Sequence, residues 1–424
     1  MGRRGSEFER SILTEPADAS TQTSRSERQT TAPARRPGLL RVAPGMDTLL
    51  PVDERALAER LITYDTSMPD GIRACAGFVK GWLEAREIDV HDTTFGELPV
   101  LTAAVGPSAG PTLVFHCHLD VVPARAEQFS PRVEGDRLYG RGAYDMKGGV
   151  AAMMCAMRDL ADQDHVRVRF VCVPDEESED IDTRSTDEVV RGGFHGDFAI
   201  TGEPTDLHVG VQAKGVLAFR LNVHGRSAHG STPWLGDNAV LKAIDVFRRI
   251  ESLPFSRESS ELFDRPSVNL GRIHGGDALN KVPDLCTMVV DIRYLPNQDP
   301  GDILEQIRSI PDIEVVRTFT RVPAYVSRLN PYVVALVSAV GRLTKGESMS
   351  VGRDGASDAV SFLQAGIPAV EFGPAGAGHH GPEEWVSVSS LARYRQALCD
   401  FVTKLPDALA GPEIGLRAVE GGLA

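Results

Sequence analysis

A histidine and an aspartate stand two residues apart at the end of an apolar run in this sequence. The run LVFHCHLD ends with His118 and Asp120. Side chains two apart in a strand lie on one face, so Asp120 can orient the imidazole of His118 if the strand continues that far. A histidine that binds a metal usually donates its other N–H to a carboxylate. The pair fits a metal ligand with its partner, but it also fits an ordinary histidine at a strand end.

Three further segments place carboxylates where a predicted strand ends or a helix begins. Asp145 lies in the glycine-flanked segment GRGAYDMKGG, before a helix-like run at 150–160, where a carboxylate can bridge two cations. Glu176 and Glu177 follow the apolar strand VRVRFVCV, at the end where open α/β sheets place their sites. One of the two can bind a metal while the other takes a proton from a water that the metal activates. Glu203 ends a predicted strand in ITGEPT, although each segment alone also fits a helix-start aspartate or a solvated acidic loop.

A pair of histidines in a glycine-rich loop near the end of the chain completes the set. They are His379 and His380 in the segment GHHGPEEW. Histidines and carboxylates that converge from strand ends suit zinc, cobalt or manganese, whereas calcium prefers oxygen ligands alone. The segments therefore predict a transition-metal site.

The elements that must position these residues alternate between helix-like segments and short apolar strands. That alternation predicts an α/β domain with a largely buried sheet. The expected strands of this domain are 98–105, 112–115, 166–173, 198–201 and 368–372. Helix-like segments at 332–343 and 391–405 flank the last strand and close the same domain.

The order of the expected elements changes between residues 216 and 319, where we expect strand, helix, strand, strand, helix and strand in succession. This βαββαβ order is that of a ferredoxin-like unit. Its elements are 216–223, 238–250, 267–273, 285–292, 301–310 and 313–318. The sequence thus predicts a discontinuous catalytic domain at 47–214 and 324–410, interrupted by an inserted domain at 215–323.

The two ends of the chain differ from these domains in composition. Residues 1–46 are rich in Ser, Thr, Pro and Arg and lack apolar periodicity, which predicts a disordered extension, with Met46 as an alternative start. A transit peptide is the other interpretation of the arginines, but the acidic residues among them argue against it. Residues 411–424 are expected to form a C-terminal tail.

The bulk properties limit the partners and the compartment. A formal net charge of -14 works against nucleic acids and anionic membranes, which attract positive patches, and favours a small molecule. The sequence has no apolar run long enough to span a membrane and no apolar stretch of a secretory signal near its start. Six scattered cysteines without a CxxC pair are expected to be reduced. These features predict a cytoplasmic protein.

The order of the motifs resembles the co-catalytic zinc family of acetylornithine deacetylase, succinyl-diaminopimelate desuccinylase, aminoacylase and carboxypeptidase G. The resemblance covers residues 52–405 and is carried by His118-x-Asp120, Asp145, Glu176-Glu177, Glu203 and His380. It implies that Asp145 bridges two metal ions, that Glu177 and His380 complete one site, and that His118 and Glu203 complete the other. It makes Glu176 the general base. The family pattern His-x-Pro-x-Glu selects His380, since Pro382 and Glu384 follow at those offsets, with His379 as the fallback.

The inserted domain resembles the lid and dimerisation domain of the same family. The segment GRSAHGSTPWLGDNAV implies that His229 reaches across a homodimer to the substrate carbonyl. The segment ALNKVPDLCTMVVDIRYLP implies that Asn280 and Arg293 hold a substrate carboxylate. Without the resemblance, a loop histidine, a turn asparagine and a structural strand arginine are the alternatives.

Together these expectations describe a metal-dependent hydrolase of the amide bond of an N-acyl-amino acid, with two zinc ions per chain that cobalt or manganese can replace. The expected fold is a zinc-peptidase-like α/β catalytic domain with a mixed central sheet and an inserted ferredoxin-like lid. The alternatives are a dipeptidase or carboxypeptidase of the same family, and a metal-stabilised protein that binds an amino acid without turnover. Glu203 favours the deacylases, and Glu176, which needs no ligand role, favours an enzyme.

Overall fold

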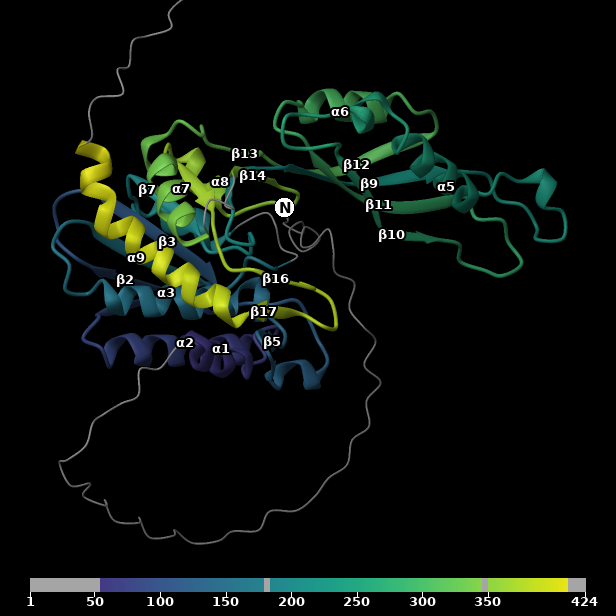
Figure 1. Ribbon diagram of the computed structural model, residues 1–424. Helices are drawn as coiled ribbons and strands as arrows, with labels where there is room; N and C mark the ends of the chain where they lie inside the picture. The colour runs from purple at the N-terminus through teal and green to yellow at the C-terminus, as the bar shows by residue number, and fades with distance from the viewer. Residues whose placement is uncertain (1–53, 179–183, 345–349, 411–424) are drawn as a thin grey trace, which may run out of the picture. The chain divides into compact units, whose positions relative to one another are not determined.

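A mixed β-sheet organises most of the chain in the computed structural model, which describes residues 54–178, 184–344 and 350–410 (Figure 1). The predictions for 1–46 and 411–424 therefore lie outside the described residues. In sheet order the strands are β1 (Val90–Phe95), β2 (Leu98–Val105), β6 (Arg167–Val173), β3 (Thr112–His118), β7 (Phe198–Thr201), β15 (Ala369–Glu371), β8 (Val209–Ala213) and β13 (Ala324–Tyr325), with β14 (Ser350–Arg353) beside β8.

The four central strands β6, β3, β7 and β15 run parallel, and antiparallel pairings flank them on both sides. Parallel strands end at the same edge of a sheet, so the residues that follow β3, β6 and β7 are neighbours in space. The predicted mixed α/β sheet is confirmed, and β2 and β7 have the predicted bounds. Strand β3 is longer than predicted and includes His118 as its last residue.

Helices cover both faces of this sheet. On one face α4 (Ser185–Arg191) and α8 (Ala359–Gln364) bury Val114, Val171 and Ala199 of the central strands. On the other face Phe198 stacks on Tyr332 of α7 (Pro331–Thr344) and contacts Phe401 of α9 (Val388–Ala410). Helix α3 (Gly148–Asp159) packs against α9, with α1 (Glu54–Ile62) and α2 (Pro69–Glu84) beside it.

Helix α3 is unusual because every residue from Gly148 to Met157 is buried. A helix that is apolar on all sides fits a position enclosed by other elements, here β3, α1 and α9. Its first turn needs glycine, since a Cβ on Gly149 would lie 2.7 Å from the carbonyl oxygen of Gly202. This close approach brings the segment that holds Asp145 against the end of β7, which leads to Glu203.

The inserted unit forms its own four-stranded antiparallel sheet in the order β10-β11-β9-β12. Its elements are β9 (Gly215–His224), α5 (Ala239–Ile250), β10 (Ser267–Gly275), β11 (Leu285–Tyr294), α6 (Pro300–Arg308) and β12 (Ile313–Arg321). The predicted βαββαβ order is therefore confirmed. Both helices begin at a side-chain cap, because Asn238 and Asp299 each accept two backbone N–H groups of the first turn.

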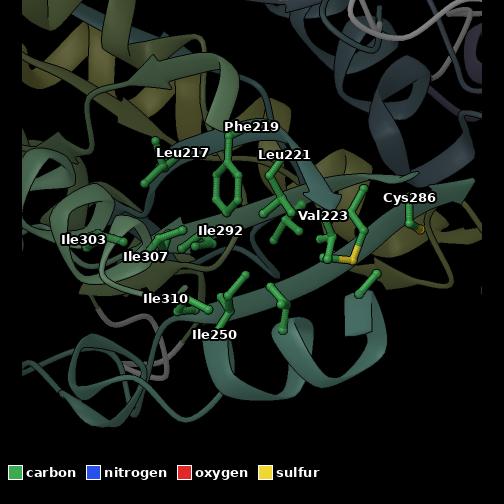
Figure 2. Packing of buried hydrophobic residues seen from close by; sticks show 14 of the residues in the cluster. Leu217, Phe219, Leu221, Val223, Ile250, Cys286, Ile292, Ile303, Ile307 and Ile310 are labelled. Carbon is green, nitrogen blue, oxygen red and sulfur yellow. The ribbon is translucent and has the colours of Figure 1, made fainter. Parts of the chain in front are cut away.

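Alternation along β9 explains how this small unit makes a core of its own. Leu217, Phe219 and Leu221 lie two residues apart and point toward the helices, where they meet Ile250 of α5 and Ile307 of α6 (Figure 2). Residues between them on the strand are less buried.

A third, small antiparallel sheet joins distant parts of the chain in the order β16-β17-β5-β4, and the sequence did not predict it. Its strands are β4 (Arg132–Glu134), β5 (Arg137–Tyr139), β16 (Gly376–Ala377) and β17 (Trp385–Ser387). Tyr139 pairs with Trp385 and Leu138 with Val386. The segment before Asp145 is thereby held against the segment that carries His380.

All six cysteines are unpaired, and five of them are buried. Within the described residues, no helix has both the length and the apolar character needed to cross a bilayer.

Candidate active site

Three neighbouring parallel strands deliver the predicted ligands to one edge of the sheet. His118 is the last residue of β3, which lies between β6 and β7. Glu176 and Glu177 follow β6, and Glu203 follows β7. Because the three strands are parallel, their ends meet, and residues from three segments of the sequence become neighbours.

His118, Asp145 and Glu203 form the first ligand group, in which the three ligand atoms lie within 4.8 Å of one another. His118 Nε2 is 3.3 Å from Asp145 Oδ1 and 3.8 Å from Glu203 Oε1. The other ring nitrogen, Nδ1, donates to the backbone carbonyl of Asp120 at 3.0 Å. That hydrogen bond orients the ring, so that Nε2, which faces the two carboxylates, is the nitrogen that could bind a metal.

Asp145, Glu177 and His380 form the second group, again with ligand atoms within 4.8 Å. His380 Nε2 lies 2.9 Å from Glu177 Oε1 and 3.6 Å from Asp145 Oδ2. Hydrogen bonds to these two carboxylates raise the pKa of His380 to about 10. Asp145 thus presents Oδ1 to the first group and Oδ2 to the second, which is the arrangement of a bridging carboxylate.

The buried carboxylates show that the site suits cations. Glu203 Oε1 is buried and has no hydrogen-bond partner in the part of the chain that the structure describes. Burial raises the pKa of Glu203 well above its ordinary value, because an uncompensated carboxylate is costly away from water, and the nearby charge of Asp145 raises it further. Two imidazoles and three carboxylates fit two borderline divalent ions, which would compensate these charges.

Asp120 reaches His118 by a route that the sequence did not predict. Strand β3 ends at His118, so Asp120 lies beyond the strand and the same-face argument is wrong. Its Oδ1 is nevertheless 3.4 Å from His118 Nδ1. The same carboxylate accepts the backbone N–H groups of Glu176 at 3.1 Å and Glu177 at 2.7 Å. Asp120 therefore also fixes the turn that holds the two glutamates.

Glu176 is placed beside the ligands without joining them. It belongs to neither of the two ligand groups found among the described residues. Burial raises the pKa of Glu176 to about 8. A carboxyl group that lies beside the ligands without binding a metal is available to accept a proton and to return it, which is the property of a general base that later acts as an acid.

The three residues predicted for the substrate lie in the inserted unit. His229 and Asn280 are exposed neighbours, since the N–H of Gly230 donates to the carbonyl of Asn280 at 2.6 Å, and His229 Nδ1 lies 2.7 Å from Ser231 Oγ. Arg293 lies on β11 and its Nε donates to Asp291 Oδ2 at 2.9 Å. The arginine side chain is 33% exposed, so part of the guanidinium is open to solvent. None of the three belongs to a ligand group found in the described part of the chain.

Two residues behind the ligands were missed by the sequence analysis. Glu384 served only to choose between His379 and His380, yet it is a buried carboxylate that binds the Asp145 segment. Arg141 is its buried ion-pair partner. Their signals were present in the His-x-Pro-x-Glu and GRG motifs, but a sequence without structure does not show that the two motifs meet.

Comparisons with known proteins agree with this architecture. A succinyl-diaminopimelate desuccinylase of Beijerinckia indica is 28% identical over 367 residues, which cover 79% of this chain and 94% of that protein. A metallo-carboxypeptidase from Sulfolobus solfataricus has a TM-score of 0.68 at 20% identity, covering 85% of this chain and 100% of that one. A dinuclear metal-binding peptidase of Bacillus subtilis has a TM-score of 0.57 at 17% identity, covering 83% and 99%.

The mixed sheet with its inserted βαββαβ unit and the paired candidate ligand groups are those of a metal-dependent hydrolase. The chain belongs to peptidase family M20/M25/M40, which it matches over residues 114–404. Its reaction is the metal-dependent hydrolysis of an amide bond. The resemblance, the fold class and the prediction of an enzyme are therefore confirmed.

Proposed function

We propose that the protein removes the acyl group from an N-acyl-amino acid, with two zinc ions held by His118, Asp145 and Glu203 and by Asp145, Glu177 and His380. The observation that carries the proposal is the shared carboxylate of Asp145, which faces both ligand groups with one oxygen each. Similar curated proteins named as desuccinylases support the N-acyl substrate class. Unpaired, mostly buried cysteines fit the reducing cytoplasm as its location.

The chain's own residues supply the proton transfers and the orientation. Bound zinc supplies a water of lowered pKa and polarises the scissile carbonyl. Glu176 accepts the proton of the attacking water and then donates it to the amide nitrogen as the C–N bond breaks, so that the products are a carboxylic acid and an amine. His229 donates a hydrogen bond to the developing oxyanion when the lid is closed, while Asn280 and Arg293 hold the substrate carboxylate.

A dipeptidase or carboxypeptidase is the second candidate, because it needs the same ligands and the same free carboxylate. The resemblance to a metallo-carboxypeptidase extends to the fold alone at 20% identity. Glu203 favours deacylation over peptide cleavage, as the family resemblance implies for a glutamate at that position. The two candidates differ only in the group on the acyl side of the scissile bond.

A substrate screen tests the proposed function. We expect the purified protein to hydrolyse one or more N-succinyl, N-acetyl or N-formyl amino acids faster than the matched dipeptides. Activity should be lost on exhaustive chelation and return with zinc, cobalt or manganese, because the nucleophile depends on the metal. Full turnover after chelation would contradict the metal mechanism, and faster dipeptide cleavage would favour the second candidate. If the protein bound these compounds without hydrolysing them, it would be a binding protein and not an enzyme of this kind.

We also propose a homodimer formed through the inserted unit. Large apolar side chains are exposed on and just before α5, and a contiguous exposed apolar surface marks an interaction site. They are Trp234, Leu235, Leu241 and Ile244. Leu241 and Ile244 lie three residues apart and so on one face of the helix. A second copy related by a two-fold axis would cover the same surface on both chains.

Light scattering coupled to size-exclusion chromatography should give twice the mass of the chain for the wild type. Leu241→Glu combined with Ile244→Glu should give a monomer with reduced activity, since His229 would no longer reach a partner's substrate. Leu329→Glu, at an exposed leucine outside the inserted unit, is the matched control and should stay dimeric. A monomeric wild type with full activity would exclude His229 acting on a partner's substrate.

A further inference from the structure

Two proposed ligands far apart in the sequence are held on adjacent loops by the small sheet of β4, β5, β16 and β17. Asp145 follows β5, and His380 lies in the loop between β16 and β17. Strands β5 and β17 pair directly, with Tyr139 opposite Trp385. The backbone pairing brings the loops together but does not by itself fix the positions of their side chains.

Glu384, the last residue before β17, fixes the loop of Asp145. Its carboxylate is 1% exposed and receives four donors from the segment 141–145. Oε2 accepts from the N–H of Gly142 at 3.0 Å and from Arg141 Nη1 at 2.6 Å. Oε1 accepts from the N–H groups of Tyr144 and Asp145, both at 3.0 Å. Both oxygens are thus engaged by donors alone, which only a carboxylate can satisfy.

Arg141 connects this arrangement to the loop of His380. Its side chain is buried, and Nη2 donates to the carbonyl of His380 at 3.2 Å while Nη1 binds Glu384. His380 has a φ of 62°, a left-handed conformation that a residue with a Cβ rarely adopts. The guanidinium therefore binds the backbone at the position where the His380 loop needs to be held in an unfavourable conformation.

We propose that the buried Arg141–Glu384 pair positions the dinuclear centre, with Glu384 setting the shared ligand Asp145 and Arg141 setting His380. Both are positioning residues, since neither belongs to a ligand group among the described residues. The inference rests on the proposed metal-ligand roles of Asp145 and His380. These hydrogen bonds hold the loops that carry the two ligands, and loss of such outer contacts lowers metal affinity.

The first test is the zinc affinity of Glu384→Gln, measured by competition with a chromophoric chelator. The amide offers one acceptor oxygen and an NH2 group that faces N–H donors, so the Asp145 loop should shift. Asp145 contributes to both ligand groups, and we expect both zinc ions to bind roughly 10- to 100-fold more weakly.

Glu54→Gln is the matched control. Glu54 is a buried glutamate of α1 whose Oε1 lies 2.6 Å from Arg395 Nη1 of α9, a distance equal to that of the Arg141–Glu384 pair. Neither residue belongs to a ligand group among the residues that the structure describes. Glu54→Gln should lower the melting temperature of the metal-free protein and leave both zinc affinities unchanged.

Arg141→Lys tests the positioning of His380 separately from the positioning of Asp145. It also provides a test of the proposal if Glu384→Gln fails to fold. Lysine keeps the charge beside Glu384, but its three donors are on one nitrogen and do not reproduce the planar fork in which Nη1 binds the carboxylate and Nη2 binds the His380 carbonyl. We expect the zinc affinity of the Asp145, Glu177 and His380 group to fall about tenfold. The zinc affinity of the other group should stay close to the wild-type value.

The outcomes distinguish this inference from the proposed function. Failure of the wild type to bind two zinc ions would remove the proposed function itself. The wild type could bind two ions while the variants melt at a lower temperature but bind zinc as tightly as the wild type. That result would leave the proposed function intact and would show that the pair is only structural. If Arg141→Lys lowered the zinc affinity of both groups equally, the separate role assigned to Arg141 would be contradicted.

Discussion

Glu176→Gln is expected to keep both metal ions and to lose turnover by roughly 10²- to 10⁴-fold. Glu176 lies beside Glu177 but is in neither ligand group among the described residues, so its replacement removes no proposed metal contact. Its backbone N–H, which donates to Asp120, is unchanged in the variant, so the turn should persist. The amide cannot accept the proton of the attacking water or return it to the leaving amine, so both proton transfers fail.

Glu177→Gln is the matched control, because it makes the same chemical change one residue further along. Glu177 Oε1 lies 2.9 Å from His380 Nε2 within the second ligand group. Its replacement should weaken metal binding, and added metal should restore part of the activity. Elemental analysis of both variants beside steady-state rates measures the difference. If Glu176→Gln lost its metals and Glu177→Gln kept them, the two roles would be reversed.

The sequence predicted the elements whose pattern is local. The mostly apolar run at 166–173 predicted the central strand β6, whose apolar side chains are all buried. The helix predicted at 238–250 is α5, which begins one residue later because Asn238 caps it, and the βαββαβ order was predicted from similar local patterns. Parallel central strands then brought His118, Glu177 and Glu203 together without further information.

Other features could not be predicted because they depend on contacts between distant segments. Strand β16 has two residues and β17 has three, too few for a period-2 pattern to be visible. The four donors that Glu384 receives come from a segment joined to it only through this pairing. Asp120 was assigned to the face of a strand that ends two residues earlier, because boundaries are the least reliable part of a sequence reading.

Arg293→Ala is expected to lower kcat/KM by roughly ten- to a few hundred-fold, because a charge-assisted hydrogen-bonded pair with a substrate carboxylate contributes about 1.5 to 3 kcal/mol. In the structure Arg293 Nε donates to Asp291 Oδ2 at 2.9 Å. A guanidinium has four further N–H donors on its two Nη atoms, and these form the planar fork that suits a carboxylate. Asp291 would then hold the arginine in place for its substrate.

The fold should survive this substitution. Both side chains of the Arg293–Asp291 pair are about one-third exposed, and a pair in such contact with water contributes less than about 1 kcal/mol. Arg272→Ala, at an exposed arginine on β10 of the same sheet, is the matched control and should leave kcat/KM unchanged. A similar melting temperature for both variants would show that a loss confined to Arg293→Ala concerns the substrate.

The decisive measurement is a cycle that combines Arg293→Ala with a substrate whose carboxylate is amidated. Amidation of the substrate alone should lower kcat/KM of the wild type by a factor similar to that of the substitution. If Arg293 binds the carboxylate, the second change should cost little once the first is made. Because the carboxylate contact would favour closure of the lid over the substrate, kcat and KM should both change. If the two losses instead multiply, Arg293 does not touch the carboxylate, and its pairing with Asp291 is a structural contact of β11.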